Sequence, residues 1–70
     1  DEIVLKGRVI SMDRGSKFKV VPDDNKDMVI DCTLSGKIRQ NYIRILVGDS
    51  VDVSMSTYDP TKGRITWRYK

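Results

Sequence analysis

Residues 35–46 read SGKIRQNYIRIL, and this stretch decides which small β-fold the chain is expected to adopt. It mixes three cations with a tyrosine and two side-chain amides, a composition that suits neither an ordinary strand nor an amphipathic helix. The hydroxyl of Ser35 can cap a short helix. We therefore expect one or two helical turns over 36–41 and a return to extended chain at 43–45.

The segments on either side alternate apolar and polar residues, which is typical of half-buried strands. Five such strands are expected, at residues 3–12, 17–21, 28–34, 51–56 and 64–69. Turns or loops are expected between them, at residues 13–16, 22–26, 48–49 and 58–63. Gly7 interrupts the first strand, where a glycine weakens pairing unless it allows a bend. We interpret it as the point at which one long strand curls and serves both sides of a barrel.

Five strands with a short helical element after the third follow the order of the OB-fold, a five-stranded Greek-key barrel whose strands and loops bind oligonucleotides. The predicted fold class is therefore all-β, a five-stranded OB-fold barrel with a short helical turn between strands 3 and 4. An SH3-like barrel is the alternative, but the long connection between the third and fourth strands favours the OB-fold. Seventy residues suffice for one small domain, which we expect to span 1–70.

Several side chains are expected in the barrel core because of their phase in the alternation. The inward set of the third strand is predicted to be Met28, Ile30, Cys32 and Leu34. Phe18 and Trp67 also fall in phase with apolar neighbours, and a barrel of this size needs large apolar side chains. Cys32 is the only cysteine, so no intramolecular disulfide can form, and we expect a buried thiol.

Positive charge is concentrated in the second half of the chain. Residues 1–36 hold six Lys/Arg and seven Asp/Glu, a net charge of −1, whereas residues 37–70 hold seven and three, a net charge of +4. The two halves add up to the overall charge of +3. This asymmetry favours a polyanionic partner, although a solvated face can have the same composition.

Catalytic and metal-binding patterns are missing from the sequence. There is no histidine, no serine or cysteine paired with a plausible base, and no glycine-rich loop that opens a helix. One cysteine without histidine cannot supply the ligands of a zinc site. We therefore expect a protein that is not an enzyme and that uses no metal or other cofactor.

Arginines and tyrosines outside the expected core are the candidates for binding nucleic acid. An arginine can direct two donors at phosphate oxygens, and a tyrosine can stack on an unpaired base. Arg64 and Arg68 are expected on one outer face of the last strand, whereas Tyr42 and Tyr58 lie in connections beside basic residues. The alternative is that the arginines form only the wet side of the barrel and the tyrosines close its ends.

The segment 35–46, followed by GDSVDVSMSTYDPTKGRITWR at 48–68, closely resembles bacterial-type translation initiation factor 1. The shared pattern is Ser-Gly-Lys, Asn-Tyr-Ile-Arg-Ile-Leu, Gly-Asp-x-Val-x-Val and Lys-Gly-Arg-Ile, with its spacing kept. The resemblance is strong over 35–68 and weak over 3–34. Four features depart from the family pattern, namely Thr33, Gln40, Pro60 and a longer and more acidic turn at 22–27. The broader S1-type RNA-binding domains share only the hydrophobic-Gly-Asp-x-Val-x-Val and Gly-Arg-Ile elements.

The resemblance implies an S1-like OB-fold domain that binds the small ribosomal subunit at its decoding (A) site. It further implies contacts with ribosomal RNA and ribosomal protein S12, and cooperation with initiation factors 2 and 3. The expected location is the bacterial cytoplasm, or an organelle with bacterial-type ribosomes, and we expect a monomer that contacts no membrane. The residues that match the family's RNA-facing pattern are Lys37, Arg39, Tyr42, Arg44, Tyr58, Lys62, Arg64 and Arg68.

Two other functions remain open at the level of the sequence. One is a generic single-strand RNA-binding or RNA-chaperone domain of the S1-like or cold-shock-like type. The other is a protein-interaction barrel that touches no nucleic acid. Dependence on salt separates the last from the others, because phosphate contacts make log affinity fall linearly with log salt.

Overall fold

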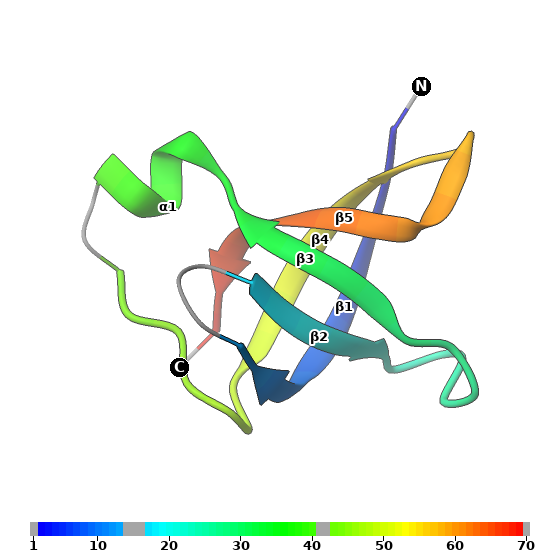
Figure 1. Cartoon of the computed structure of the whole chain (residues 1–70), viewed down its shortest axis with the longest axis horizontal. Helices are drawn as coiled ribbons and strands as arrows, with labels where there is room; N and C mark the ends of the chain where they lie inside the picture. The colour runs from blue at the N-terminus through cyan, green and yellow to red at the C-terminus, as the bar shows by residue number, and fades with distance from the viewer. Residues whose placement is uncertain (1, 14–16, 41–42, 70) are drawn as a thin grey trace.

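A closed β-barrel forms the body of the molecule (Figure 1). The computed structural model describes residues 2–13, 17–40 and 43–69. Its elements are β1 (Glu2–Met12), β2 (Lys17–Pro22), β3 (Ile30–Leu34), α1 (Gly36–Gln40), β4 (Ser50–Ser56) and β5 (Asp59–Arg68). Around the barrel the strands follow the order β1-β2-β3-β5-β4, and all neighbours are antiparallel except β3 and β5. The predicted five-stranded OB-fold barrel, with a short helix between β3 and β4, is confirmed.

The long strand β1 serves both sides of the barrel, as the position of Gly7 predicted. Residues 2–8 pair with β4, and residues 7–9 and 11–12 pair with β2, so Gly7 and Arg8 are shared by the two ladders. A Cβ atom on Gly7 would lie 2.6 Å from the backbone oxygen of Val21. A hydrogen at this position therefore allows β1 to approach β2 closely enough for the barrel to close.

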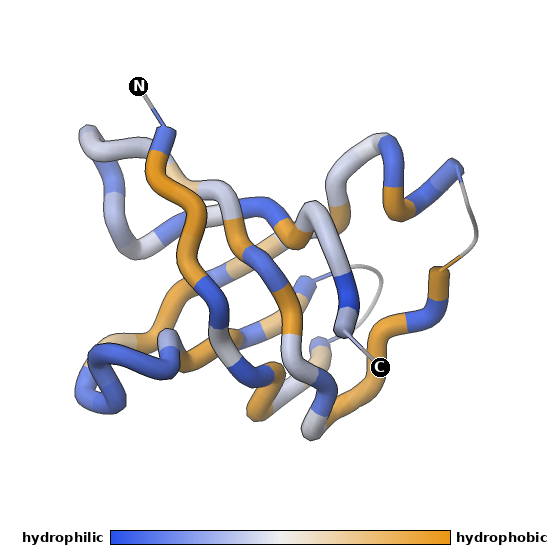
Figure 2. The backbone as a smooth tube through the Cα atoms, turned by 180° about the vertical axis from the view of Figure 1, so that it is seen from behind, coloured by the Kyte–Doolittle hydropathy of each residue, from blue (hydrophilic) through white to orange (hydrophobic). Residues whose placement is uncertain are grey.

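Hydrophobic residues alternate with hydrophilic ones along the strands (Figure 2), and one set of them is buried in the barrel. Phe18 and Cys32 are buried, which confirms both predictions. Of the predicted inward set in the third strand, Ile30 and Cys32 are buried, while Met28 and Leu34 pack against the core from partly exposed positions. The buried hydrophobic residues are Val9, Phe18, Val20, Ile30, Cys32, Ile38, Ile45, Val51, Val53, Met55 and Ile65.

The prediction that Trp67 belongs to the core is wrong, since its side chain is 49% exposed. The reason is an irregularity in β5. Val53 pairs with Ile65, but the next residue of β4, Asp52, pairs with Trp67, so Thr66 has no partner opposite it. Residues paired across two strands point to the same side of the sheet. One extra residue in β5 therefore turns Trp67 to the outer surface with Asp52, although alternation from Ile65 directs it inward.

The predicted loop over 58–63 is also wrong, because only residues 57 and 58 form the turn and β5 begins at Asp59. Asp59 accepts two hydrogen bonds from Thr61, one from the backbone N–H at 3.2 Å and one from the hydroxyl at 2.6 Å. Further along, Lys62 and Gly63 pair in parallel with Asp31 and Cys32 of β3. Asp59 itself pairs with Ser56 of β4, so pairing with both β3 and β4 extends β5 beyond what its own alternation predicts.

The connection between β3 and β4 closes one end of the barrel. The Ser35 hydroxyl accepts a hydrogen bond from the backbone N–H of Ile38 at 3.3 Å, so Ser35 caps α1 as predicted. Ile38 is fully buried, and Ile45 is nearly so. The predicted helical turns end at Gln40 among the described residues, and the extended segment at 43–45 joins no strand ladder.

Candidate nucleic-acid interface

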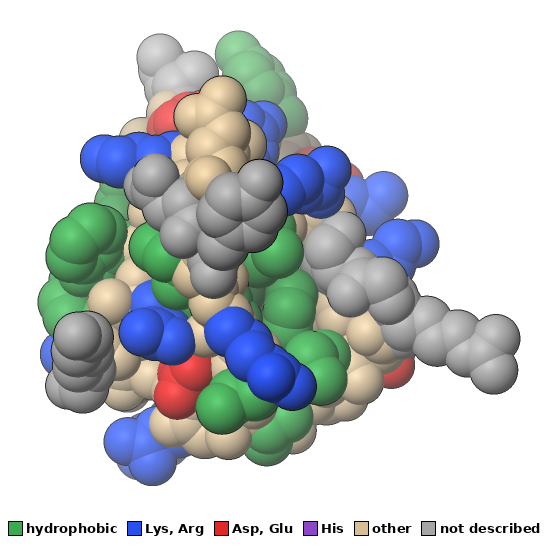
Figure 3. Space-filling view, turned by 90° about the vertical axis from the view of Figure 1, so that its left-hand side faces the viewer, with side chains coloured by type: hydrophobic (Ala, Val, Ile, Leu, Met, Phe, Trp, Pro, Cys, Tyr) green, Lys and Arg blue, Asp and Glu red, His purple; other side chains and the backbone are tan. Residues whose placement is uncertain are grey.

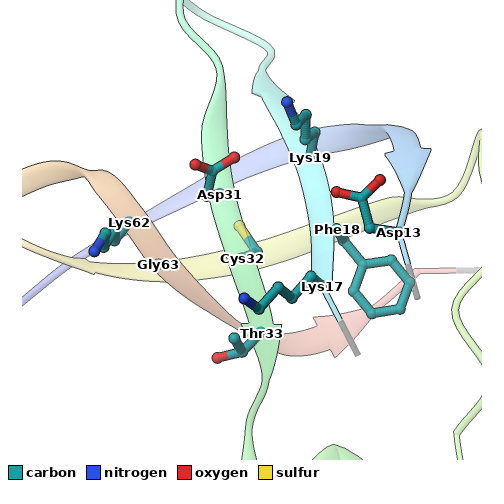
Figure 4. Close-up of a pocket in the computed structure, with 9 residues that line it drawn as sticks. All are labelled: Asp13, Lys17, Phe18, Lys19, Asp31, Cys32, Thr33, Lys62 and Gly63. Carbon is teal, nitrogen blue, oxygen red and sulfur yellow. The ribbon is translucent and has the colours of Figure 1, made fainter. Parts of the chain in front are cut away.

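A shallow groove of about 530 Å³ lies on the outer surface of the barrel over β2, β3 and β5 (Figure 4). Its polar lining comes from three lysines, two aspartates and a threonine. These residues are Lys17, Lys19, Lys62, Asp13, Asp31 and Thr33. Alternation along the strands explains their outward direction, because the residues between them, such as Phe18 and Cys32, fill the core.

The strand register sets the order of these charges. Lys19 and Lys62 pair with Asp31 from its two sides, so this row places an aspartate between two lysines. In the next row, Lys17 pairs with Thr33, and Thr33 pairs with Arg64. That row holds no acidic group between its two cations. This row, at the edge of the groove, is therefore the part of the surface best suited to an anion such as a phosphate.

Of the predicted site residues, Lys62 lines this groove, and Arg64 lies next to it on β5. Both are exposed, and both line a neighbouring depression that Glu2 and residues of β4 also line. Arg64 pairs with Ser54 on β4 and Thr33 on β3, so its side chain emerges from the middle of the outer sheet surface. An exposed guanidinium on a rigid strand can meet phosphate oxygens with two donors.

A second group of cations lies at the end of the barrel that carries α1. Lys37 and Arg39 are exposed residues in the last turn of this helix, and Arg44 is exposed in the connection that follows. Figure 3 shows this end, where Lys and Arg side chains surround exposed hydrophobic ones and acidic side chains are few. Ile38 anchors the helix in the core, and the cations on either side of it are directed outward as a consequence.

The sequence predicted that Arg68 shares an outer face with Arg64, and this prediction is wrong. The unpaired Thr66 shifts the alternation, and Arg68 pairs with the buried Val51 instead of an outward residue. Its Nη1 donates to the backbone carbonyl of Arg44 at 2.6 Å. Arg68 thus links the end of β5 to the connection that carries Arg44.

Of the two tyrosines in the predicted site, the structure describes Tyr58. Tyr58 lies in the turn between β4 and β5 and is 89% exposed, so it does not close the barrel. Its backbone N–H donates to the Ser56 hydroxyl at 3.0 Å, which stabilises the turn. Tyr42 lies outside the described residues.

Lys17 and Lys19 line the groove but were not among the predicted site residues. The sequence did place them on the polar face of the second strand. It could not show that β3 joins this face to β5, because a parallel pairing between distant strands has no local signature. The signal available in the sequence was a pair of lysines at alternate positions of a strand, which indicates a basic outer face.

Burial raises the pKa of the Cys32 thiol to about 12, and the negative charge of Asp31 adds to the effect. This cysteine is therefore a core residue rather than a nucleophile at neutral pH. Within the described ranges, no group of His, Cys, Asp and Glu side chains is arranged to hold a metal ion. No helix in the same part of the chain is long and apolar enough to cross a membrane.

The closed barrel and its basic outer surface define a small OB-fold protein with a candidate site for a polyanion. Comparison with solved structures specifies the class further. The chain is 39% identical to translation initiation factor 1 from the Wolbachia endosymbiont strain TRS of Brugia malayi, with a TM-score of 0.79. The match covers 99% of this chain and 79% of that one. The chain therefore belongs to the translation initiation factor 1 family, and the resemblance seen in the sequence is confirmed.

The same barrel is also found within larger proteins. YloQ, a circularly permuted GTPase, matches with 25% identity and a TM-score of 0.79, and YjeQ from Thermotoga maritima with 29% identity and a TM-score of 0.75. Each match covers 97% of this chain but only 23% of the other protein. No protein-family model matches the chain.

Proposed function

We propose that this translation initiation factor acts by binding the small ribosomal subunit at the decoding site through ribosomal RNA. Membership of the initiation factor family is the observation that carries the proposal. The exposed cations on α1 and β5 support it, because phosphate contacts supply much of the affinity of proteins for RNA. Lys37, Arg39 and Arg44 are assigned to one end of the contact surface, and Lys62 and Arg64 to the sheet surface.

The barrel supplies a rigid support for these contacts. The backbone of Arg64 is held by two ladders, through Thr33 on β3 and Ser54 on β4, and that of Lys62 is held by its pairing with Asp31 on β3. Arg68 positions the connection at Arg44 through its hydrogen bond and is assigned a supporting role rather than a direct contact. Tyr58 is assigned to stacking on an unpaired base, because its ring is almost entirely exposed beside this surface.

The proposed partners follow from the proposed site. At the decoding site the protein would contact ribosomal protein S12 and assist initiation factors 2 and 3. It would act as a monomer in the bacterial cytoplasm or in an organelle with bacterial-type ribosomes. It needs no catalytic group and no cofactor for this role, since covering a site requires only binding.

Hydroxyl-radical footprinting of small subunits tests the location of binding. We expect protection of decoding-site nucleotides when the protein is bound, and stronger protection when factors 2 and 3 are present. The variant Arg64→Gln should need a higher protein concentration than the wild type to give the same protection. Protection elsewhere on the subunit, with the decoding site unchanged, would contradict the proposal.

The second candidate function is a generic single-strand RNA-binding or RNA-chaperone domain. The basic groove over β2 and β3 favours it, because this surface of an OB-fold commonly binds oligonucleotides without reference to a ribosome. Competition distinguishes the two functions. A generic binder would transfer from small subunits to free single-stranded RNA at equal nucleotide concentration, whereas a site-specific factor would remain on the subunit.

A further inference from the structure

An ordered group of aromatic and basic side chains lies on the outer surface of β1, β4 and β5, away from the groove over β2 and β3. Its members are Lys6, Arg8, Trp67 and Tyr69, which we call the Trp67 platform. Asp52 on β4 pairs with Lys6 on one side and Trp67 on the other, so all three emerge in one row. In the next row, Arg8 pairs with Ser50, whose carbonyl accepts the backbone N–H of Tyr69 at 2.8 Å.

The platform is held in place by its own contacts. The Tyr69 hydroxyl donates to the Asp52 carboxylate, with both oxygens at 2.9 Å. The ammonium of Lys6 lies 4.6 Å from the centre of the Tyr69 ring, within the range of a cation–π contact. Asp52 is thereby occupied in orienting Tyr69, while Trp67 beside it remains 49% exposed.

Exposure of Trp67 is a cost to a barrel of this size. A small domain has few large apolar side chains with which to fill its core. Here the extra residue Thr66 turns the only tryptophan of the chain outward, next to an ordered tyrosine. A rigid sheet that presents aromatic rings among cations is the arrangement with which many domains bind unpaired bases.

We propose that the Trp67 platform binds a single-stranded segment of RNA, with a base stacked on Trp67 and the flanking phosphates on Lys6 and Arg8. This inference rests on the proposed function, which makes RNA the ligand, and it adds a second contact surface on the barrel. The exposed ring of Trp67 supports a nucleic acid over an acidic peptide, because a base can stack on it and an acidic side chain cannot. Lys6 and Arg8 are two residues apart on β1, about 6.7 Å, and both are exposed.

The single tryptophan provides a direct probe. Titration of the wild-type protein with an oligouridine of about eight nucleotides, a typical OB-fold site size, should quench the fluorescence of Trp67 in a saturable manner. A duplex RNA of equal length and inorganic polyphosphate should produce little quenching, because neither offers an unstacked base. No quenching by oligouridine, or equal quenching by polyphosphate or by oligoglutamate, would overturn the proposal.

Variants test the same site by the anisotropy of a labelled oligouridine. Trp67→Leu should weaken binding roughly 5- to 150-fold, the equivalent of one stacked base, whereas Trp67→Phe should retain most of the affinity. Lys6→Gln should lower the slope of log affinity against log salt by about 0.7. Val29→Ala, an exposed apolar truncation in the β2–β3 connection, is the matched control and should change nothing. Equal affinities of Trp67→Leu, Trp67→Phe and wild type would overturn the proposal.

Co-sedimentation with small subunits, measured in parallel, separates this inference from the proposed function. Wild-type protein that sediments with subunits but shows no oligouridine quenching would leave the function standing and exclude the platform. Protein that does neither would contradict both. If Trp67→Leu does not fold, the quenching of the wild type and the affinity of Trp67→Phe still decide the question.

Discussion

The guanidinium of Arg68 donates from Nη1 to the backbone carbonyl of Arg44 over 2.6 Å, which ties the end of β5 to the connection between α1 and β4. The two residues are 24 positions apart in the chain, and both belong to the set that the sequence predicted to face RNA. The bond assigns them different roles, because a guanidinium that holds a carbonyl has fewer donors left for phosphate. Arg68 acts on the candidate site through the position of Arg44.

Arg68→Ala should therefore lower both stability and affinity for small subunits. Loss of a hydrogen bond from a charged donor costs roughly 1–2 kcal/mol at a partly exposed position, or several degrees in Tm for a domain of this size. Arg64→Ala is the matched control, since Arg64 is exposed on the outer sheet surface, and it should reduce affinity with an unchanged Tm. Thermal denaturation followed by circular dichroism measures both. An Arg68→Ala protein as stable as Arg64→Ala would show that the bond to Arg44 contributes nothing.

Gly63→Ala should destabilise the barrel. A Cβ atom there would lie 2.5 Å from Cγ1 of Val53 and 3.1 Å from the backbone oxygen of Ser54, at the place where β5 lies between β3 and β4. Overpacking of this kind costs about 1–3 kcal/mol. Gly36→Ala is the control, because nothing lies within 4 Å of its Cβ position and alanine favours a helix. Chemical denaturation should show a lower midpoint for the first variant and an equal or higher one for the second.

Cys32 should react slowly with a thiol reagent in the native protein and rapidly after denaturation. Its folded pKa is raised from 9.0 to about 12, so the folded state holds the proton more tightly than the unfolded state. This contribution to stability is complete below pH 9 and is lost as pH rises toward 12, at about 1 kcal/mol per pH unit. A Cys32→Ala variant should be less stable near neutral pH but should lose less stability between pH 9 and 11. Stability that falls equally with pH in the two proteins would contradict a raised pKa of the buried Cys32 thiol.

Tyr58→Ala should leave Tm nearly unchanged, because a side chain that is 89% exposed contributes little packing. If the ring stacks on a base of ribosomal RNA, as proposed, the substitution should cost ~1–3 kcal/mol of binding free energy, and Tyr58→Phe should cost little. Equilibrium binding to small subunits measures this. A full-affinity Tyr58→Ala protein would remove Tyr58 from the contact surface and leave the cations as its main components.

Local pattern was sufficient to predict the barrel, because most of its strands keep strict alternation and Ser35 begins the helix with a capping hydroxyl. It was not sufficient where pairing between distant strands decides the structure. The early start of β5 depends on the pairing of Asp59 with Ser56 on β4 and of Lys62 and Gly63 with β3, and the outward direction of Trp67 depends on a register shift against β4. The residues that precede and follow these positions in the chain carry no pattern that predicts either the strand pairing or the register shift.

In the candidate site, too, some features could be predicted from local sequence and others could not. Exposure of Lys37, Arg39, Arg44, Lys62 and Arg64 was predicted from their polar surroundings, and it is found. The role of Arg68 could not be predicted, because the extra residue in β5 reverses the side to which it points. Ile38 was missed as a core residue, since a single isoleucine within a polar segment carries no periodic signal. The burial of this residue nevertheless fixes the position of the cations beside it.

Equilibrium co-sedimentation with purified bacterial small subunits over a range of salt concentrations measures the proposed binding to the ribosome and its dependence on phosphate contacts. We predict saturable binding at one protein per subunit, with log affinity falling linearly as log salt rises. Lys62→Gln combined with Arg64→Gln should weaken binding at least about 10-fold, since removal of two phosphate contacts costs more than ~1.4 kcal/mol. Lys26→Gln, an exposed lysine beyond the proposed surface, should bind as the wild type does. Binding that does not saturate, that is insensitive to salt, or that is unchanged in the double variant would contradict the account.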